Sequence, residues 1–70
     1  MAYIQVGRPV AQSDMWFATE LAARIGVAAA ARRIGTTRGT LAAVIAGLPI
    51  AASTEERVRS ARLRSERKAA

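Results

Sequence analysis

Apolar residues recur at helical spacing in the first third of the chain. They lie three or four positions apart, and this period places them on one face of an amphipathic helix. These residues are Met15, Ala18, Leu21, Ala22 and Ile25. We expect the helix to begin at Ser13, whose hydroxyl can accept a hydrogen bond from an early backbone N–H, and to end at Gly26. Asp14 then lies in the first turn, where the helix dipole favours negative charge.

Two aromatic residues, Trp16 and Phe17, are neighbours on this predicted helix. Adjacent helical positions point in different directions, so both rings cannot face the core equally. We expect one ring to pack in the core and the other to face solvent or a second subunit. The sequence leaves open which ring takes which place.

A Gly-Thr-Thr break at residues 35–37 separates two further predicted helices. The first spans residues 27–34, an alanine-rich stretch that has Arg32 and Arg33 in its last turn and is stopped by Gly35. Thr36 or Thr37 caps the second helix, which we expect to end at Gly47 and Pro49. Its inward stripe is Leu41, Val44, Ile45 and Leu48.

The last predicted helix has a clear start signal. Ser53 and Glu56 have the spacing of a capping box, in which each side chain accepts from the other residue's backbone N–H. Val58 and Ala61 then face inward, and residues 69–70 are expected to fray.

The N-terminal segment, residues 1–12, shows no helical period and predicts a non-helical arm, in which residues 3–6 could form a short strand. The patterns together predict an all-α fold of four or five helices, with a single domain at residues 13–68. We expect a shared core of Ala18, Leu21, Ala22, Ile25, Ala31, Ile34, Leu41, Val44 and Leu48.

The net charge of the chain indicates what kind of partner it binds. The chain has eleven Lys and Arg residues, ten of them Arg, against five Asp and Glu, for a net charge of +6. A basic excess in a small domain favours a polyanionic partner, and arginine suits bidentate contacts with phosphates and guanine. The alternative is a merely soluble surface from an Arg-rich, Ala-rich genome.

No part of the sequence predicts an enzyme, a cofactor or a metal site. The chain has no Cys and no His, which excludes disulfides, thiolate metal sites and the commonest general base. Asp14 and Glu20 do not share a helix face, and no glycine-rich phosphate loop with a lysine is present.

The hydropathy pattern argues against a membrane partner. The longest uncharged run, residues 39–54, is interrupted by Pro49 and is shorter than the about 20 apolar residues that span a bilayer. The first residues lack the pattern of a signal peptide. We therefore expect a cytoplasmic protein.

The helices around the break also have the residue types that two crossing helices need. Ala31 is small where the helices cross, Gly35 permits a positive φ in the turn, and Leu41 and Val44 face inward. With Gly47 ending the second helix, residues 27–47 resemble the helix-turn-helix of the phage lambda repressor and Cro superfamily. The resemblance implies a lambda-repressor-like domain whose third helix enters the major groove of operator DNA, usually as a homodimer on an inverted repeat.

Candidate DNA contacts follow from the resemblance. Seven residues would face the bases: Thr37, Arg38, Gly39, Thr40, Ala42, Ala43 and Ala46. Arg38 is the only long side chain among them, and a bidentate arginine–guanine contact is worth about 1–3 kcal/mol of discrimination. The small residues would let the helix backbone approach the base pairs closely. The alternative is that they are present only because alanine favours helix formation. Phosphate contacts are expected from Arg8, Arg32, Arg33 and Thr36. Thr36 departs from the family, in which this turn position is usually apolar.

These expectations lead to one functional prediction and two alternatives. We predict a sequence-specific double-stranded DNA-binding protein, a small transcriptional repressor of a phage or other mobile element that occludes a promoter and has no evident small-molecule effector. One alternative is a non-specific or structural nucleic-acid-binding protein, favoured by the scarcity of base-reading side chains. The other is a helical adaptor that uses its alanine-rich face against another protein.

Overall fold

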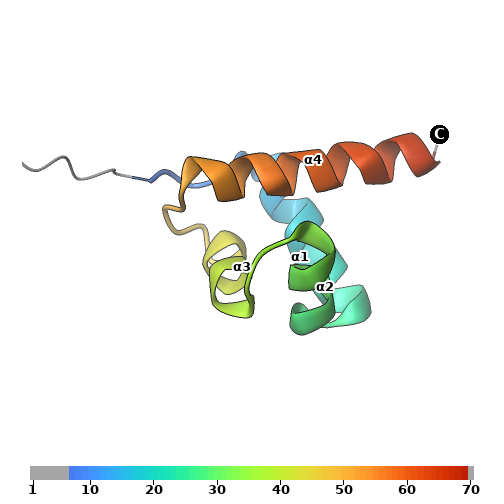
Figure 1. Cartoon of the computed structure of the whole chain (residues 1–70), viewed down its shortest axis with the longest axis horizontal. Coiled ribbons are helices and arrows are strands. Elements are labelled where there is room, and N and C mark those ends of the chain that lie inside the picture. Colours follow the sequence, from blue (N-terminus) through green and yellow to red (C-terminus); the bar gives the residue numbers. More distant parts are fainter. Residues whose placement is uncertain (1–6, 70) are drawn as a thin grey trace, which may run out of the picture.

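The computed structural model describes residues 7–69, and this range contains four α-helices and no extended strand. The helices are α1 (Gln12–Ile25), α2 (Val27–Ile34), α3 (Arg38–Ile45) and α4 (Ala52–Ala69). Helices α1, α2 and α3 pack on one another, and the long α4 lies across α1 and α2 (Figure 1). The all-α prediction is therefore confirmed, with four helices in the described range.

The predicted cap of α1 is wrong by two positions. The N-cap residue is Ala11, whose carbonyl accepts from the backbone N–H groups of Asp14 and Met15 at 3.0 Å each. Ser13 is already inside the first turn, so its hydroxyl is not needed to start the helix. Asp14 does lie in the first turn, as predicted.

The predicted capping box of α4 is also wrong. The helix begins at Ala52, one residue before Ser53, and the carbonyl of Ala51 accepts from the N–H groups of Thr54 and Glu55. The residue just before Ala51 is Ile50, which pairs with the N-terminal segment.

That pairing is a single antiparallel bridge between Arg8 and Ile50. The N–H of Ile50 donates to the carbonyl of Arg8 at 3.1 Å, and the reverse bond is 3.3 Å. A side chain on Gly7 would collide with the backbone of Ile50, so glycine is required for this close approach. The bridge accompanies the burial of Val10 and Ile50. Residues 7–11 are non-helical and contact the domain through this bridge and through Val10, whereas Gln12 already belongs to α1. The possible strand at residues 3–6 lies outside the described range.

The core lies where α1, α2 and α3 meet under α4. It consists of Val10, Ala18, Leu21, Ala30, Ala31, Ile34, Leu41, Val44, Ile50, Val58 and Ala61. Ala22 and Ile45 are half-buried against it. Two predicted core residues are wrong, since Ile25 is 37% exposed and Leu48 is 53% exposed. Ile25 ends α1, and Leu48 follows Gly47, whose positive φ turns the chain away from the α3 axis.

The two aromatic neighbours on α1 differ in environment. Phe17 is half-buried and packs against the core, whereas Trp16 is 62% exposed. The question left open by the sequence is therefore resolved in favour of Phe17 as the core aromatic residue.

At the other end of the chain, α4 remains helical to Ala69, one residue into the segment expected to fray, and residue 70 lies outside the described range. None of the helices described is both long and apolar enough to cross a membrane.

Candidate nucleic-acid interface

The connection between α2 and α3 is a short turn that is fixed at both ends. Gly35 closes α2 in the left-handed conformation, with φ 93° and ψ 35°. The N–H groups of Gly35 and Thr36 both donate to the carbonyl of Ala31 at 2.9 Å. Only a residue that tolerates positive φ allows the chain to leave α2 in this direction. The predicted bounds of α2 and its predicted glycine stop are both confirmed.

The start of α3 is fixed by two threonines. Thr37 is the N-cap, and its hydroxyl accepts from the N–H of Thr40 at 3.2 Å while donating to the Thr40 hydroxyl at 2.9 Å. This resolves the choice between Thr36 and Thr37 as the cap. Thr36 is half-buried in the turn.

The turn is also held from α4. The Nη1 of Arg57 donates to the carbonyl of Gly35 at 2.7 Å. This carbonyl is one of those left without a partner at the end of α2, so the arginine satisfies it and ties α4 to the turn. The local sequence pattern around Arg57 does not indicate this contact, because the partner lies 22 positions away.

The exposed face of α3 begins in its first turn. Arg38, Gly39, Ala42 and Ala46 are exposed, as a DNA-facing surface requires. Thr40 is half-buried and hydrogen-bonded to the cap. Ala43 is also half-buried and packs against the core, so it offers less surface to a partner than was predicted.

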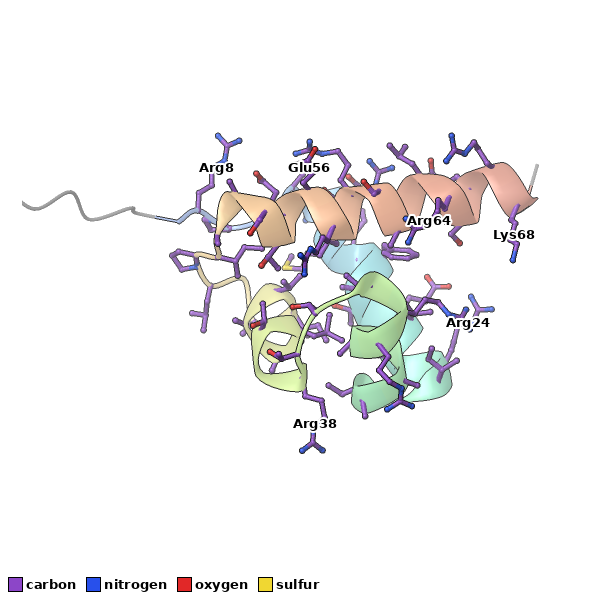
Figure 2. The ribbon with its side chains drawn as sticks, viewed as in Figure 1. Arg8, Arg24, Arg38, Glu56, Arg64 and Lys68 are labelled. Carbon is purple, nitrogen blue, oxygen red and sulfur yellow. The ribbon has the colours of Figure 1, made fainter. Side chains whose placement is uncertain are left out.

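Arg38 lies at the end of the molecule farthest from α4. Both α2 and α3 begin at this end and run toward α4 (Figure 1). Figure 2 shows the Arg38 side chain extending away from the body of the protein. Within the described range it forms no ion pair, so its charge is available to an external anion.

The four predicted phosphate contacts do not lie together. Arg32 is exposed. Arg33 lines a groove beside α4, together with Phe17 and Leu21. Arg8 lies on the far side of the molecule from Arg38 (Figure 2), where its Nη2 is 3.4 Å from Oε1 of Glu55. Arg8 therefore lies away from Arg38, and its phosphate contact stays a prediction.

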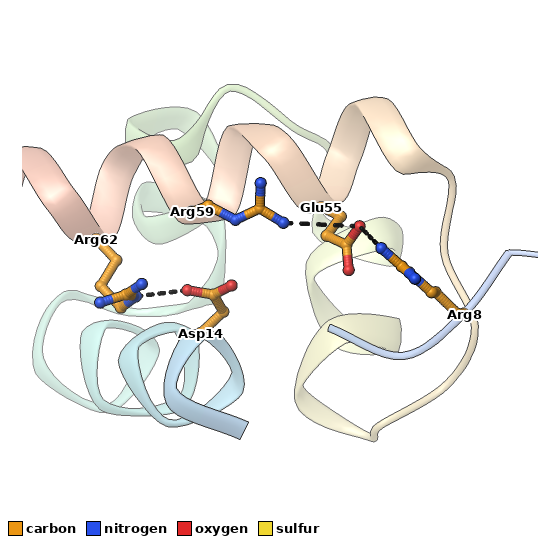
Figure 3. Close-up of polar contacts among 5 residues, drawn as sticks. All are labelled: Arg8, Asp14, Glu55, Arg59 and Arg62. Atoms are coloured by element: carbon orange, nitrogen blue, oxygen red, sulfur yellow. Dashed lines mark hydrogen bonds and ion pairs between the residues drawn. The ribbon is translucent and has the colours of Figure 1, made fainter. Parts of the chain in front are cut away.

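Some arginines form ion pairs with carboxylates, whereas others, such as Arg38, form none in the described range. Two buried carboxylates, Asp14 and Glu55, hold arginines around the start of α1 and α4 (Figure 3). Asp14 is 1% exposed and accepts from Nε of Arg62 at 2.5 Å, and Glu55 contacts Arg8 and Arg59. The Asp14 pair was not predicted from the sequence, because the helix dipole already accounted for an acid in the first turn of α1.

The Asp14 pair also fixes the charge state of its arginine. Hydrogen bonds to Asp14 and then to Glu66 raise the pKa of Arg62 above its usual value. Arg62 therefore stays charged and joins α4 to α1, and it is not free to bind an external anion.

Comparison of the chain with models of known protein families, with curated proteins and with solved structures finds no match. The base-facing and phosphate-contacting roles therefore remain predictions that rest on the sequence pattern and on the geometry of α2, the turn and α3.

Proposed function

We propose that this chain binds double-stranded DNA sequence-specifically through a helix-turn-helix formed by α2, the turn at residues 35–37 and α3. The observation that carries the proposal is the first turn of α3. This turn is exposed at the end of the molecule where two helices begin, and it carries an arginine without an ion-pair partner in the described range. A helix presented in this way suits the major groove, which its N-terminal residues enter.

The residues of this surface divide between bases and phosphates. Arg38 has the length and the two parallel N–H donors needed to bind a guanine edge. Gly39 and Ala42 are small and exposed, so they allow the helix backbone to approach the base pairs closely. Arg32 is the proposed phosphate contact, while Arg33 faces the groove beside α4.

The proposed biological role is that of a small repressor of the lambda repressor and Cro type, encoded by a phage or other mobile element. A homodimer bound at an inverted-repeat operator would occlude the promoter from polymerase. This role rests on the resemblance of residues 27–47 and on the placement of α3.

The experiment compares two arginine variants on a duplex selected from a random library and on a scrambled duplex. We expect Arg38→Ala to weaken binding to the selected site by about 1–3 kcal/mol, to change binding to scrambled DNA less, and to relax the preference at one base position per half-site. Arg32→Ala should weaken both affinities similarly and reduce the slope of log affinity against log salt by about one.

A second candidate is a non-specific nucleic-acid-binding protein. It is favoured by one observation, that Arg38 is the only long side chain on the exposed face of α3. If Arg38→Ala lowers affinity for both duplexes equally, Arg38 is a further phosphate contact and this second function is the better one.

A further inference from the structure

A groove runs between α1 and the C-terminal half of α4, away from Arg38 at the start of α3 (Figure 2). It has a volume of about 700 Å³. Its floor is apolar and is formed by Phe17, Leu21 and Ala61. A neighbouring hollow shares Phe17 and Leu21 with it and contains the exposed ring of Trp16. That hollow is lined by charges of both signs, including Glu20 and Glu66, so the purely basic rim belongs to the first groove alone. Trp16, which is 62% exposed, therefore lies beside the groove and can report on its occupancy.

The rim of the groove carries charge of one sign. Arg33 from the end of α2 and Arg64, Arg67 and Lys68 from α4 line it, and no carboxylate does. Figure 2 shows Arg64 and Lys68 on the side of α4 that faces α1 and α2. None of these four cations forms an ion pair among residues 7–68, whereas Arg59 and Arg62 on the same helix are both paired.

We propose that this groove, which we call the basic groove, binds an acidic amphipathic helix of a partner protein. An apolar stripe on such a helix would cover Phe17, Leu21 and Ala61, and flanking carboxylates would pair with the four rim cations. Grooves between helices commonly accept an amphipathic helix through side chains spaced at three and four positions. Charge complementarity of this kind chooses the partner and speeds the encounter.

A second copy of this chain does not fit the basic groove. The chain has only five carboxylate side chains. Asp14 and Glu55 are buried and paired, Glu20 and Glu66 lie within 4.0 Å of arginines, and Glu56 alone forms no ion pair in the described range. A second protomer therefore cannot present several free carboxylates beside an apolar stripe.

A nucleic-acid backbone suits the basic groove less well than an acidic helix does. Phosphates would satisfy the rim cations, but a duplex backbone has no apolar side chain to cover the floor. The groove also lies away from Arg38, so a partner helix there leaves the first turn of α3 exposed. The proposal does not depend on DNA binding, and its test needs no DNA to be bound.

The test uses a synthetic helix-forming peptide of about 14 residues, with leucine at helical spacing on one face and glutamate on both flanks. The peptide contains no tryptophan, so the fluorescence of Trp16, the only tryptophan of the chain, reports binding. Amide chemical shifts of the labelled protein locate the site. A charge-reversed peptide with lysine in place of glutamate is the ligand control.

Two double variants with equal net charge are compared. Arg67→Ala with Lys68→Ala removes two cations of the basic groove, and we expect it to weaken peptide binding by about fivefold, as the loss of two exposed ion pairs would. Arg32→Ala with Arg38→Ala removes two cations elsewhere and should leave peptide binding unchanged. Shifts should be largest at Phe17, Leu21 and Ser65, and the lysine peptide should not bind.

Three results would overturn the proposal. The first is that the glutamate peptide does not bind, and the second is that both double variants weaken it equally, which would indicate attraction by net charge alone. The third is that a scrambled DNA duplex shifts the same amides and displaces the peptide, which would make the groove a nucleic-acid site. DNA binding by the Arg32 and Arg38 variant tests only the proposed function, and peptide binding tests only the basic groove. A failure of one proposal can therefore be distinguished from a failure of the other.

Discussion

Leu41 and Leu48 show how differently one residue type can contribute to this domain. Both lie in the stripe predicted for the third helix, yet Leu41 is fully buried and Leu48 is 53% exposed. The helix ends at Ile45, before its period reaches Leu48. Only Leu41 therefore fills space in the core.

The two leucines give a matched pair for testing the core. We expect Leu41→Ala to cost about 2–5 kcal/mol of unfolding free energy, because it leaves a cavity in the centre of a small domain. Leu48→Ala should change the unfolding free energy by less than about 0.5 kcal/mol. Urea denaturation of both variants measures the difference, and equal losses would mean that α3 is not packed as described.

The buried acid Asp14 makes a second prediction at this scale. Arg62→Met would leave the Asp14 carboxylate buried without its partner, so the variant should be clearly less stable than Arg59→Met, whose partner Glu55 keeps Arg8. Replacing the pair together, as Asp14→Leu with Arg62→Met, should restore part of the loss. Thermal denaturation of the three variants provides the test, and equal midpoints for the two single variants would contradict a structural role for the pair.

The pH dependence of this pair follows from the raised pKa of Arg62. A base with a raised folded-state pKa contributes stability that is present below the unfolded-state pKa and is lost only as pH rises through the folded value. The arginine side of the pair should therefore not weaken across the neutral and moderately alkaline range.

Among the elements, the turn between α2 and α3 depends on backbone conformation more than on contacts. Gly35 has φ 93°, and a Cβ built there would meet only the Cδ of Arg57, at 4.0 Å. Gly39 lies inside α3 without a positive φ, and a Cβ there would meet nothing within 4 Å. Replacing each glycine by alanine therefore adds a methyl group without a steric clash. The difference in unfolding free energy between the two variants measures the cost of the left-handed backbone conformation at Gly35.

We expect the two glycine substitutions to have opposite effects. Gly35→Ala should destabilise the domain by about 1–2 kcal/mol, because an L-residue is strained in the left-handed region. Gly39→Ala should stabilise it by up to about 1 kcal/mol, because alanine loses less conformational entropy in a helix. Thermal unfolding of both variants gives the comparison, and a stabilising Gly35→Ala would show that the turn does not hold the left-handed conformation.

For the whole molecule, one exposed long side chain on α3 reads too few base pairs for useful specificity. We therefore expect two protomers on each full-affinity DNA site, with their α3 helices about 34 Å apart, one turn of duplex. The site should then be an inverted repeat. Sedimentation of the protein–DNA complex measures the stoichiometry, and a single protomer on a minimal full-affinity site would contradict the dimer.

The sequence by itself determined the features that depend on neighbouring residues. The bounds of α2, the glycine stop at Gly35, the threonine cap of α3 and the inward positions of Leu41, Val44, Val58 and Ala61 were all predicted correctly. The helical period, a glycine in the left-handed conformation and a side-chain cap each depend on residues within about four positions of one another. They can therefore be predicted from the local sequence. For the candidate site, the outward position of the first turn of α3 was expected from the family resemblance, and its residues Arg38 and Gly39 are exposed.

Tertiary structure alone decided the features that join distant segments. Asp14 meets Arg62, Arg57 meets the turn at Gly35, and Arg8 pairs with Ile50 and Glu55 across the fold. These contacts join α4 to α1 and to the turn, and they place Arg8 beside Glu55, away from Arg38. A local pattern gives each residue its propensity. It does not contain the partner that the folded chain brings to that residue, because such contacts depend on how the helices pack in space.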